Sequence, residues 1–162
     1  MNLDDLNRFK QLDTLNMLGE IDDLPDQLGR AFQLGMKHEL PDWDDFKQVV
    51  IAGMGASAIG ADLLAAYCGS VSPLPVSVHR DYGLPFFARS TETPVICSSH
   101  SGNTEETLDA FEAARAAGCR IIAVSTGGEL AKRAEEMPDN HVEARQHTLP
   151  GARLRFAPIH NV

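Results

Sequence analysis

Apolar residues recur about every third position through the start of the chain. They are Leu6, Phe9, Leu12, Leu15, Leu18 and Ile21. This spacing approximates one face of an amphipathic helix, so we expect a helix over residues 6–21. Residues 1–50 also hold eleven Asp and Glu against five Lys and Arg. We interpret the acidic residues as the solvated faces of helices; a functional acidic surface is the alternative.

A second helix is expected from Leu24 to Leu34. Pro25 suits its first turn, where no backbone N–H is needed. The side chains expected to face inward are Leu28, Phe32 and Leu34. We therefore predict that residues 1–46 form a helical segment that packs on the domain that follows.

The pattern changes at residue 47, where short β-branched runs begin to alternate with helical segments. Strands are expected at residues 48–53, 75–79, 94–98 and 120–125, and helices at residues 58–67, 104–117 and 129–136. Such alternation forms a parallel sheet through right-handed crossovers, with helices on both faces. The pattern therefore predicts an α/β fold with its core over residues 47–136.

Residues 137–162 depart from this pattern. They carry three of the six histidines, three arginines and three prolines, with no clear apolar period. The sheet calls for a fifth strand near residue 142, and residues 141–145 are a poor candidate. Without it, the edge at residues 120–125 would be bare, which invites aggregation or pairing. We interpret this segment as a divergent, poorly ordered tail, and a frame-shifted or truncated reading frame is one hypothesis for it.

Composition places the chain among ordinary globular proteins. Its 162 residues are 43% hydrophobic and 23% charged, which suits one domain with a core. No apolar run approaches the roughly 20 residues that span a bilayer, and the acidic start does not match a signal peptide. The net charge of -9 argues against non-specific nucleic-acid binding but does not exclude a local site for a small anion. Cys68, Cys97 and Cys119 lack metal-ligand spacing, so we expect reduced thiols in a cytoplasmic protein.

A glycine-rich turn follows the first expected strand, over residues 53–60. Gly53 and Gly55 permit backbone conformations closed to other residues. Ser57 falls at the start of a helix, where free backbone N–H groups attract an anion. The spacing loosely fits a dinucleotide fingerprint, but Arg80 stands where that fold needs an acidic residue. Taken alone, the segment is either a phosphate site or a tight structural turn.

A hydroxyl-rich turn follows the third expected strand, over residues 98–107. Its four hydroxyls belong to Ser98, Ser99, Ser101 and Thr104. A helix cap needs only one hydroxyl, whereas several neutral donors at a helix N-terminus can hold a phosphate. We interpret His100 as a packed or solvent-facing residue, with a catalytic role as the alternative. Both turns lie at the carboxyl ends of strands, where open parallel sheets bind ligands, so they predict one shared anion site.

These residues resemble the sugar isomerase (SIS) domain superfamily, and within it the bifunctional phosphoglucose/phosphomannose isomerases of archaea and bacteria. The resemblance covers residues 10–136 and rests on residues 24–28, 50–60 and 99–108. The sequence departs from the family at Ala56, where glycine is usual, and at His100, where tyrosine is usual.

The resemblance implies a three-layer αβα sandwich, flavodoxin-like, around a five-stranded parallel sheet preceded by N-terminal helices. It also implies a hexose phosphate as ligand, with no metal or nucleotide cofactor. The residues it assigns to phosphate contact are Ser57, Ser99, Ser101 and Thr104, with Gly53, Gly55, Gly102 and Asn103 as the supporting loop. Ser99 and Ser101 are expected to be exposed, so replacing both with alanine should abolish phosphosugar binding and alter stability by no more than about 1 kcal/mol.

Members of this family interconvert glucose-6-phosphate or mannose-6-phosphate with fructose-6-phosphate through a cis-enediol. They carry two SIS domains, and the glutamate base, the ring-opening histidine and a lysine belong to the second, which has no counterpart here. The family's catalytic arginine follows the fifth strand, but neither Arg153 nor Arg155 aligns with it, so the catalytic residues are unknown. We therefore expect no isomerase activity from this chain alone, and a second SIS domain or a homodimer as partner.

Two other functions remain open. A single SIS domain can sense a phosphosugar without catalysis, although no basic segment here would bind DNA. A nucleotide-binding α/β domain is the third hypothesis, which binding of NAD without hexose phosphates would favour.

Overall fold

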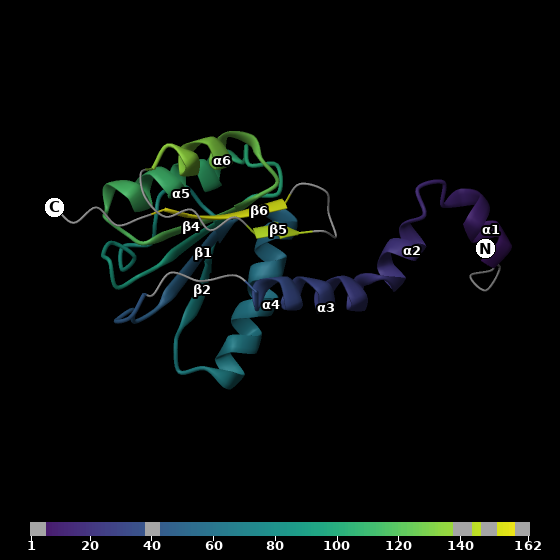
Figure 1. The fold of residues 1–162 in the computed structure, drawn as a ribbon, viewed down its shortest axis with the longest axis horizontal. Coiled ribbons are helices and arrows are strands. Elements are labelled where there is room, and N and C mark those ends of the chain that lie inside the picture. The colour runs from purple at the N-terminus through teal and green to yellow at the C-terminus, as the bar shows by residue number, and fades with distance from the viewer. Residues whose placement is uncertain (1–5, 38–42, 138–143, 147–151, 158–162) are drawn as a thin grey trace. The chain divides into compact units, whose positions relative to one another are not determined.

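The computed structural model describes residues 6–37, 43–137, 144–146 and 152–157. The chain divides into two compact units, residues 1–37 and 38–162. The first unit holds three helices: α1 (Leu6–Leu12), α2 (Met17–Asp22) and α3 (Leu24–Gly35) (Figure 1). N-terminal helices therefore precede the sheet, as expected.

The expectation of a single helix over residues 6–21 is wrong, because a turn at residues 13–16 separates α1 from α2. Asn16, the residue before α2, has a left-handed φ of 55°, which a continuous right-handed helix cannot include. The Asp13 carboxylate accepts hydrogen bonds from the backbone N–H of Met17 at 2.6 Å and of Leu18 at 2.8 Å. A carboxylate that satisfies the first N–H groups of a helix defines a new start, which apolar spacing alone does not reveal.

Helix α3 forms where it was expected, with Pro25 in its first turn. Its own unit does not bury the side chains that were expected to face inward. Leu28 and Phe32 are largely exposed, Leu34 is half-buried, and no residue of α3 is buried. The physical reason is size: a segment this short has too little apolar surface to enclose a core of its own.

The second unit is built on a twisted sheet of six described strands in the order β2-β1-β3-β4-β6-β5. Four are parallel to one another, and they are β1 (Val49–Gly53), β2 (Val76–His79), β3 (Val95–Ser98) and β4 (Ile121–Ser125). The helices are α4 (Gly55–Val71), α5 (Glu105–Ala116) and α6 (Gly128–Glu135). All seven elements match the sequence expectation to within a few residues, and the α/β fold is confirmed.

The helices cover the two faces of the sheet unequally. Helix α4 packs on β1 and β2 from one face, whereas α5 and α6 lie together on the other (Figure 1). The main core lies under α5 and α6; its largest fully buried side chains are Val50, Val95, Phe111, Ile121 and Leu130. Along β3 and β4 every second residue is buried, so these strands direct one set of side chains into this core.

The expectation of a bare sheet edge beside β4 is wrong. Strand β6 (Ala152–Ala157) pairs antiparallel with β4 along its whole length, and β5 (Ala144–Gln146) pairs antiparallel with β6. The described sheet therefore has four parallel strands and an antiparallel pair, not the five parallel strands that the resemblance implied. Residues 152–157 alternate polar and apolar positions, a period-two signal that the search for a helical or continuous apolar pattern overlooked. The rest of residues 138–162 lies outside the described residues.

Candidate functional site: three turns at the carboxyl edge of the sheet

The glycine-rich and hydroxyl-rich turns begin at residues that face each other in the sheet. Gly53 at the end of β1 is the register partner of Ser98 at the end of β3. A Cβ on Gly53 would lie 2.8 Å from the carbonyl oxygen of Ser98, closer than real Cβ atoms approach. Only glycine lets the two backbones come this near. The two turns therefore leave the sheet side by side.

The glycine-rich turn leads directly into α4. Gly55 has a left-handed φ of 53°, and the first bond within the helix runs from the Ala58 N–H to the Met54 carbonyl at 3.3 Å. No side chain caps this end of the helix. The backbone N–H groups of residues 55–57 are thus available to an anion, and the half-buried Ser57 adds its hydroxyl in the same helical turn.

The hydroxyl-rich turn is organised by Ser99, which is buried. Its Oγ lies 2.8 Å from Thr104 Oγ1 and accepts a hydrogen bond from the Gly102 N–H at 3.1 Å. Ser101 is exposed, and its Oγ accepts from the Asn103 N–H at 3.2 Å. The expectation that both serines are exposed therefore holds for Ser101 and is wrong for Ser99, whose hydroxyl shapes the turn from within.

These internal bonds leave hydroxyl protons for a ligand. A hydroxyl has one proton to donate and can accept two hydrogen bonds. Among the bonds of Ser99, Ser101 and Thr104 in the described structure, only the Ser99–Thr104 contact uses a hydroxyl proton. Helix α5, which starts at Glu105, also has no side-chain cap, although Leu108 N–H already bonds the Thr104 carbonyl at 3.0 Å. The turn can therefore still donate from two hydroxyls and from the first N–H groups of the helix.

A third turn, which the sequence analysis missed, holds the hydroxyl-rich turn in place. It joins β4 to α6 through Thr126, Gly127 and Gly128. The N–H and the hydroxyl of Thr126 both donate to the His100 carbonyl, at 3.0 and 2.6 Å. The N–H groups of Glu129 and Leu130 donate to Asn103 Oδ1 at 3.0 Å and to the Gly102 carbonyl at 2.8 Å. Asn103 thus supports the turn by capping α6.

The glycines of this third turn explain the close fit. A Cβ on Gly102 would overlap the Gly127 carbonyl group, and one on Gly128 would overlap the Ser101 carbonyl oxygen. Gly102 and Gly128 also have left-handed φ values of 69° and 71°. The signal was present in the sequence, because small polar residues and glycines follow the fourth expected strand just as they follow the first.

The segment after β2 contacts both α4 and α5. Arg80 donates to the Ala58 carbonyl at 3.4 Å and pairs with Asp62, both on α4. On α5, Glu105 accepts from the Tyr82 hydroxyl at 3.2 Å, and this bond with the negative charge of Glu105 raises the pKa of Tyr82. These contacts place a cation, not a ribose-binding acid, at the end of β2.

The hydrogen-bond donors that the three turns offer at the carboxyl edge of the sheet are uncharged. Its hydroxyls and backbone N–H groups can hold a phosphate, while two acidic residues, Glu105 and Glu106, occupy the first turn of α5. The register of β6 also places Arg153 opposite Ser125, at the same end of β4 as the third turn. The described residues contain no group of three or more His, Cys, Asp or Glu that could hold a metal ion.

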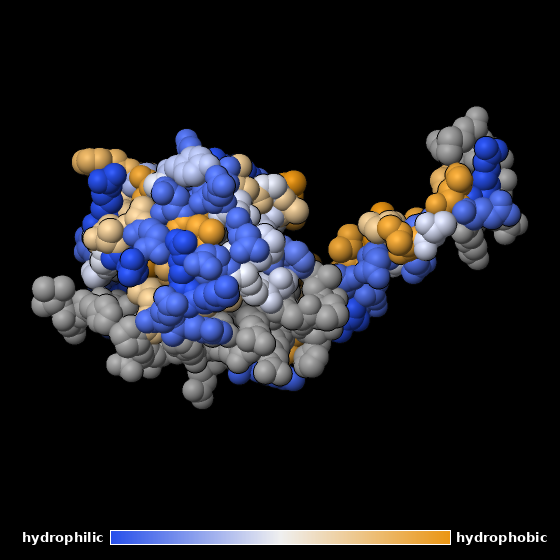
Figure 2. Space-filling model, turned by 90° about the horizontal axis from the view of Figure 1, so that it is seen from above, coloured by the Kyte–Doolittle hydropathy of each residue, from blue (hydrophilic) through white to orange (hydrophobic). Residues whose placement is uncertain are grey.

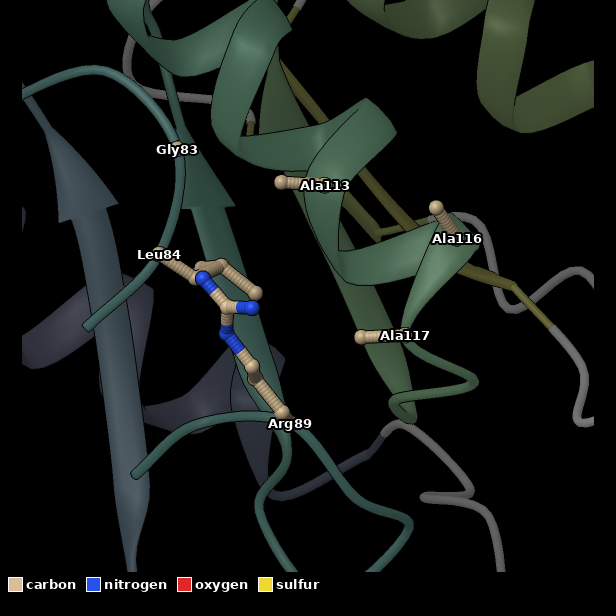
Figure 3. A pocket seen from close by; sticks show the side chains of 6 residues that line it. All are labelled: Gly83, Leu84, Arg89, Ala113, Ala116 and Ala117. Atoms are coloured by element: carbon tan, nitrogen blue, oxygen red, sulfur yellow. The ribbon is translucent and has the colours of Figure 1, made fainter. Parts of the chain in front are cut away.

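One cavity of about 390 Å³ lies elsewhere, between the segment after β2 and the last turns of α5. It is lined by Gly83, Leu84, Arg89, Ala113, Ala116 and Ala117 (Figure 3). None of these residues belongs to the three turns. The three turns lie at the ends of helices on the surface, so the position of this cavity does not indicate where they would bind an anion.

A parallel sheet whose carboxyl edge carries two uncapped helix N-termini defines an α/β domain suited to a small anion. More specifically, the chain belongs to the SIS domain family, whose model matches residues 45–147.

Its relatives include several proteins named bifunctional phosphoglucose/phosphomannose isomerase. The protein of Caldicellulosiruptor bescii is 44% identical over 121 residues, which are 74% of this chain and 35% of the relative. That of Thermoplasma acidophilum is 41% identical over 54% of this chain and 27% of its own length. That of Aquifex aeolicus is 36% identical over 59% and 32%. The chain thus matches about a third of the length of these relatives.

In the described residues, no helix has the length and apolar character needed to cross a membrane.

Proposed function

We propose that this chain is a phosphosugar-binding SIS domain, corresponding to the N-terminal part of an aldose–ketose isomerase. The ligand is a hexose phosphate, glucose-6-phosphate or mannose-6-phosphate on one side of the reaction and fructose-6-phosphate on the other. The names of the relatives support this assignment. The observation that carries it is the pair of uncapped N-termini of α4 and α5. They follow two neighbouring strands at Gly53 and Ser98, and the hydroxyl-rich turn still has hydroxyl protons to donate.

Phosphate contact is proposed for Ser57, Ser99, Ser101 and Thr104, and the backbone N–H groups at the start of α4 and α5 share the charge. Neutral hydrogen-bond donors in a preformed turn suit a dianion, because several of them can donate to the same phosphate without a Lys or Arg side chain. Among the supporting residues, Gly53 and Gly102 allow the turns to approach, and Asn103 fixes the hydroxyl-rich turn to α6.

Alone, the chain is proposed to bind without turnover. Proton transfer between C1 and C2 of a sugar needs a general base within hydrogen-bond reach. The acids nearest in sequence to the phosphate contacts are Glu105 and Glu106, at the start of the helix that would hold the phosphate itself. We propose that a second SIS domain or a second copy of the chain completes an active site. A non-catalytic phosphosugar sensor is the alternative that retains the same binding site.

We also propose that the protein is located in the cytoplasm. Cys68, Cys97 and Cys119 are free cysteines, and burial together with the neighbouring Cys119 raises the pKa of the Cys97 thiol to about 12. A protonated, buried thiol is unreactive, which fits a structural role in a reducing compartment.

Isothermal titration calorimetry with glucose-6-phosphate, mannose-6-phosphate, fructose-6-phosphate and NAD tests the binding site. We expect hexose phosphates to bind and NAD not to bind. Ser101→Ala should weaken binding at least about tenfold and leave stability within about 0.5 kcal/mol, since Ser101 is exposed. Ser99→Ala should also weaken binding but cost about 1–3 kcal/mol of stability, because its buried hydroxyl accepts the Gly102 N–H.

Ser70→Ala is the matched control, because Ser70 is an exposed serine whose hydroxyl bonds the Tyr67 carbonyl at 2.7 Å, outside the three turns. It should bind like the unmodified chain. Retained binding by Ser101→Ala and Ser99→Ala would overturn the site, binding of NAD alone would favour the nucleotide hypothesis, and measurable isomerase turnover by the isolated chain would overturn the proposed inactivity.

A further inference from the structure

The connection from β2 to β3 crosses the sheet without a helix. Strand β1 lies between these two strands, so residues 80–94 must pass over it, and they do so as turns and irregular backbone. A right-handed crossover lies on the face of α5, and the buried Ala88 joins the core on that side. Irregular backbone fills less space there than a helix would, which accounts for the cavity of about 390 Å³ beside α5.

Apolar side chains form most of the wall of this cavity. Ala113, Ala116 and Ala117 line it from the C-terminal end of α5, and Leu84, which packs against the core, lines it from the crossover (Figure 3). Hydrophilic residues predominate on the outer face of α5 and α6 (Figure 2). The wall thus differs from the surface around these helices. Apolar hollows of roughly 300–1,000 Å³ with a few polar groups are typical of sites for small molecules.

Arg89 is the one charged side chain among the residues that line the cavity. Its guanidinium carbon lies 5.5 Å from the centroid of the Phe86 ring, which is a cation–π distance. Among the described residues this guanidinium makes no hydrogen bond or ion pair, although the chain carries a net charge of -9. Its five N–H groups are therefore available to a ligand in the cavity.

The cavity is held in shape by contacts on both of its sides. Ala88, next to Arg89, is fully buried, and its carbonyl accepts a hydrogen bond from Cys119 Sγ at 3.5 Å. At the other end of the crossover, the Gly83 N–H donates to the carboxylate of Asp109 on α5 at 2.6 Å. A ligand would thus enter a preformed site and would not have to order the segment that binds it.

We propose that this cavity binds a small carboxylate whose other end is apolar, such as a ring or a branched chain. The planar guanidinium of Arg89 pairs with a carboxylate through two parallel N–H···O bonds, and the apolar end packs on Leu84 and the alanines. A sugar phosphate suits this wall poorly, because its hydroxyls would lose hydrogen bonds to water against methyl groups. The proposal does not rest on the proposed function, since no lining residue belongs to the three turns.

A ¹H–¹⁵N NMR titration of the chain with benzoate, up to roughly 30 mM, tests the proposal. A ligand of this size should bind with a Kd on the order of 1 mM. We expect saturable shifts on the backbone amides of Gly83, Arg89, Ala113 and Ala117. Benzamide has the same shape without the charge, and inorganic phosphate has charge without an apolar body. Each should bind in the cavity at least about tenfold more weakly than benzoate.

Three variants locate the contacts. Arg89→Gln should weaken benzoate binding at least about tenfold, because it removes the charge and the paired N–H donors. Arg115→Gln is the matched control: Arg115 is an exposed arginine near the same end of α5, pairs with Glu112 at 2.6 Å and does not line the cavity. It should bind benzoate like the unmodified chain. Ala113→Leu should fill the cavity and abolish binding while keeping the circular dichroism spectrum, since leucine favours a helix.

Several results would overturn the proposal. They are the absence of saturable shifts with benzoate, equal binding of benzamide or phosphate in the cavity, unchanged binding by Arg89→Gln, and a loss in Arg115→Gln as large as in Arg89→Gln. A parallel titration with glucose-6-phosphate separates this proposal from the proposed function. Benzoate shifts in the cavity without sugar-phosphate shifts at residues 55–57 and 105–107 would support the cavity and count against the proposed function alone.

Discussion

At the scale of the residue, the candidate site depends on glycines that let backbones approach. Gly53 faces the carbonyl of Ser98, Gly102 faces that of Gly127, and Gly128 faces that of Ser101. The sequence alone indicated a role for Gly53, because it ends an expected strand, and the family resemblance implied one for Gly102. It could not show which backbone atoms each glycine faces, since the contacts join segments far apart in the chain.

Gly53→Ala tests this account of close approach. We expect the free energy of unfolding to fall by about 1–3 kcal/mol, because the added methyl group must displace the Ser98 backbone on the neighbouring strand. Urea denaturation provides the measurement. Gly69→Ala is the control, since a Cβ there meets nothing within 4 Å and alanine favours helix α4. Equal stability changes in the two variants would contradict the account.

At the scale of the element, the sequence pattern predicted the strands and helices of residues 47–136 because turn signals separate them, and β3, β4 and α5 each bury one clear face. Periodicity did not predict the boundary between α1 and α2, because local hydrogen bonds determine it. The Asp13 carboxylate bonds the first N–H groups of α2, although the apolar pattern continues across this position. The sequence indicated the two turns that follow β1 and β3, but the buried state of Ser99 and the third turn at Thr126 depend on tertiary contacts.

We predict that the antiparallel strand β6 protects the edge of the sheet at β4 from aggregation. Ending the chain after Met137 removes β5 and β6 and leaves the N–H and C=O groups of one edge of β4 unpaired. We expect this variant to aggregate faster than the full chain, as followed by light scattering at matched concentrations. A variant that lacks only residues 158–162 keeps β6 and should behave like the full chain. Equal aggregation of all three would show that β6 does not protect the edge.

At the scale of the whole molecule, the chain consists of a short helical unit and a unit that matches the SIS domain family. It matches about a third of the length of its isomerase relatives. The division into residues 1–46, 47–136 and 137–162, with the first packed on the second, stays a prediction, as does the frame-shift hypothesis. An intact in-frame continuation of the gene with a different tail would refute the latter.

The net charge of -9 does not oppose phosphate binding at this edge. Attraction arises locally, from helix ends and donors within a few ångströms, and screening limits the effect of distant acids. This explains why the net charge argues against non-specific nucleic-acid binding and yet permits a local site for a small anion.

The most direct test of the phosphate-binding edge is a ¹H–¹⁵N NMR titration of the chain with glucose-6-phosphate. The account predicts that the largest shifts fall on the backbone amides of residues 55–57 and 105–107, which begin α4 and α5, and on those of Ser99 and Ser101. Shifts confined to the cavity beside Arg89, or none at saturating sugar phosphate, would contradict it.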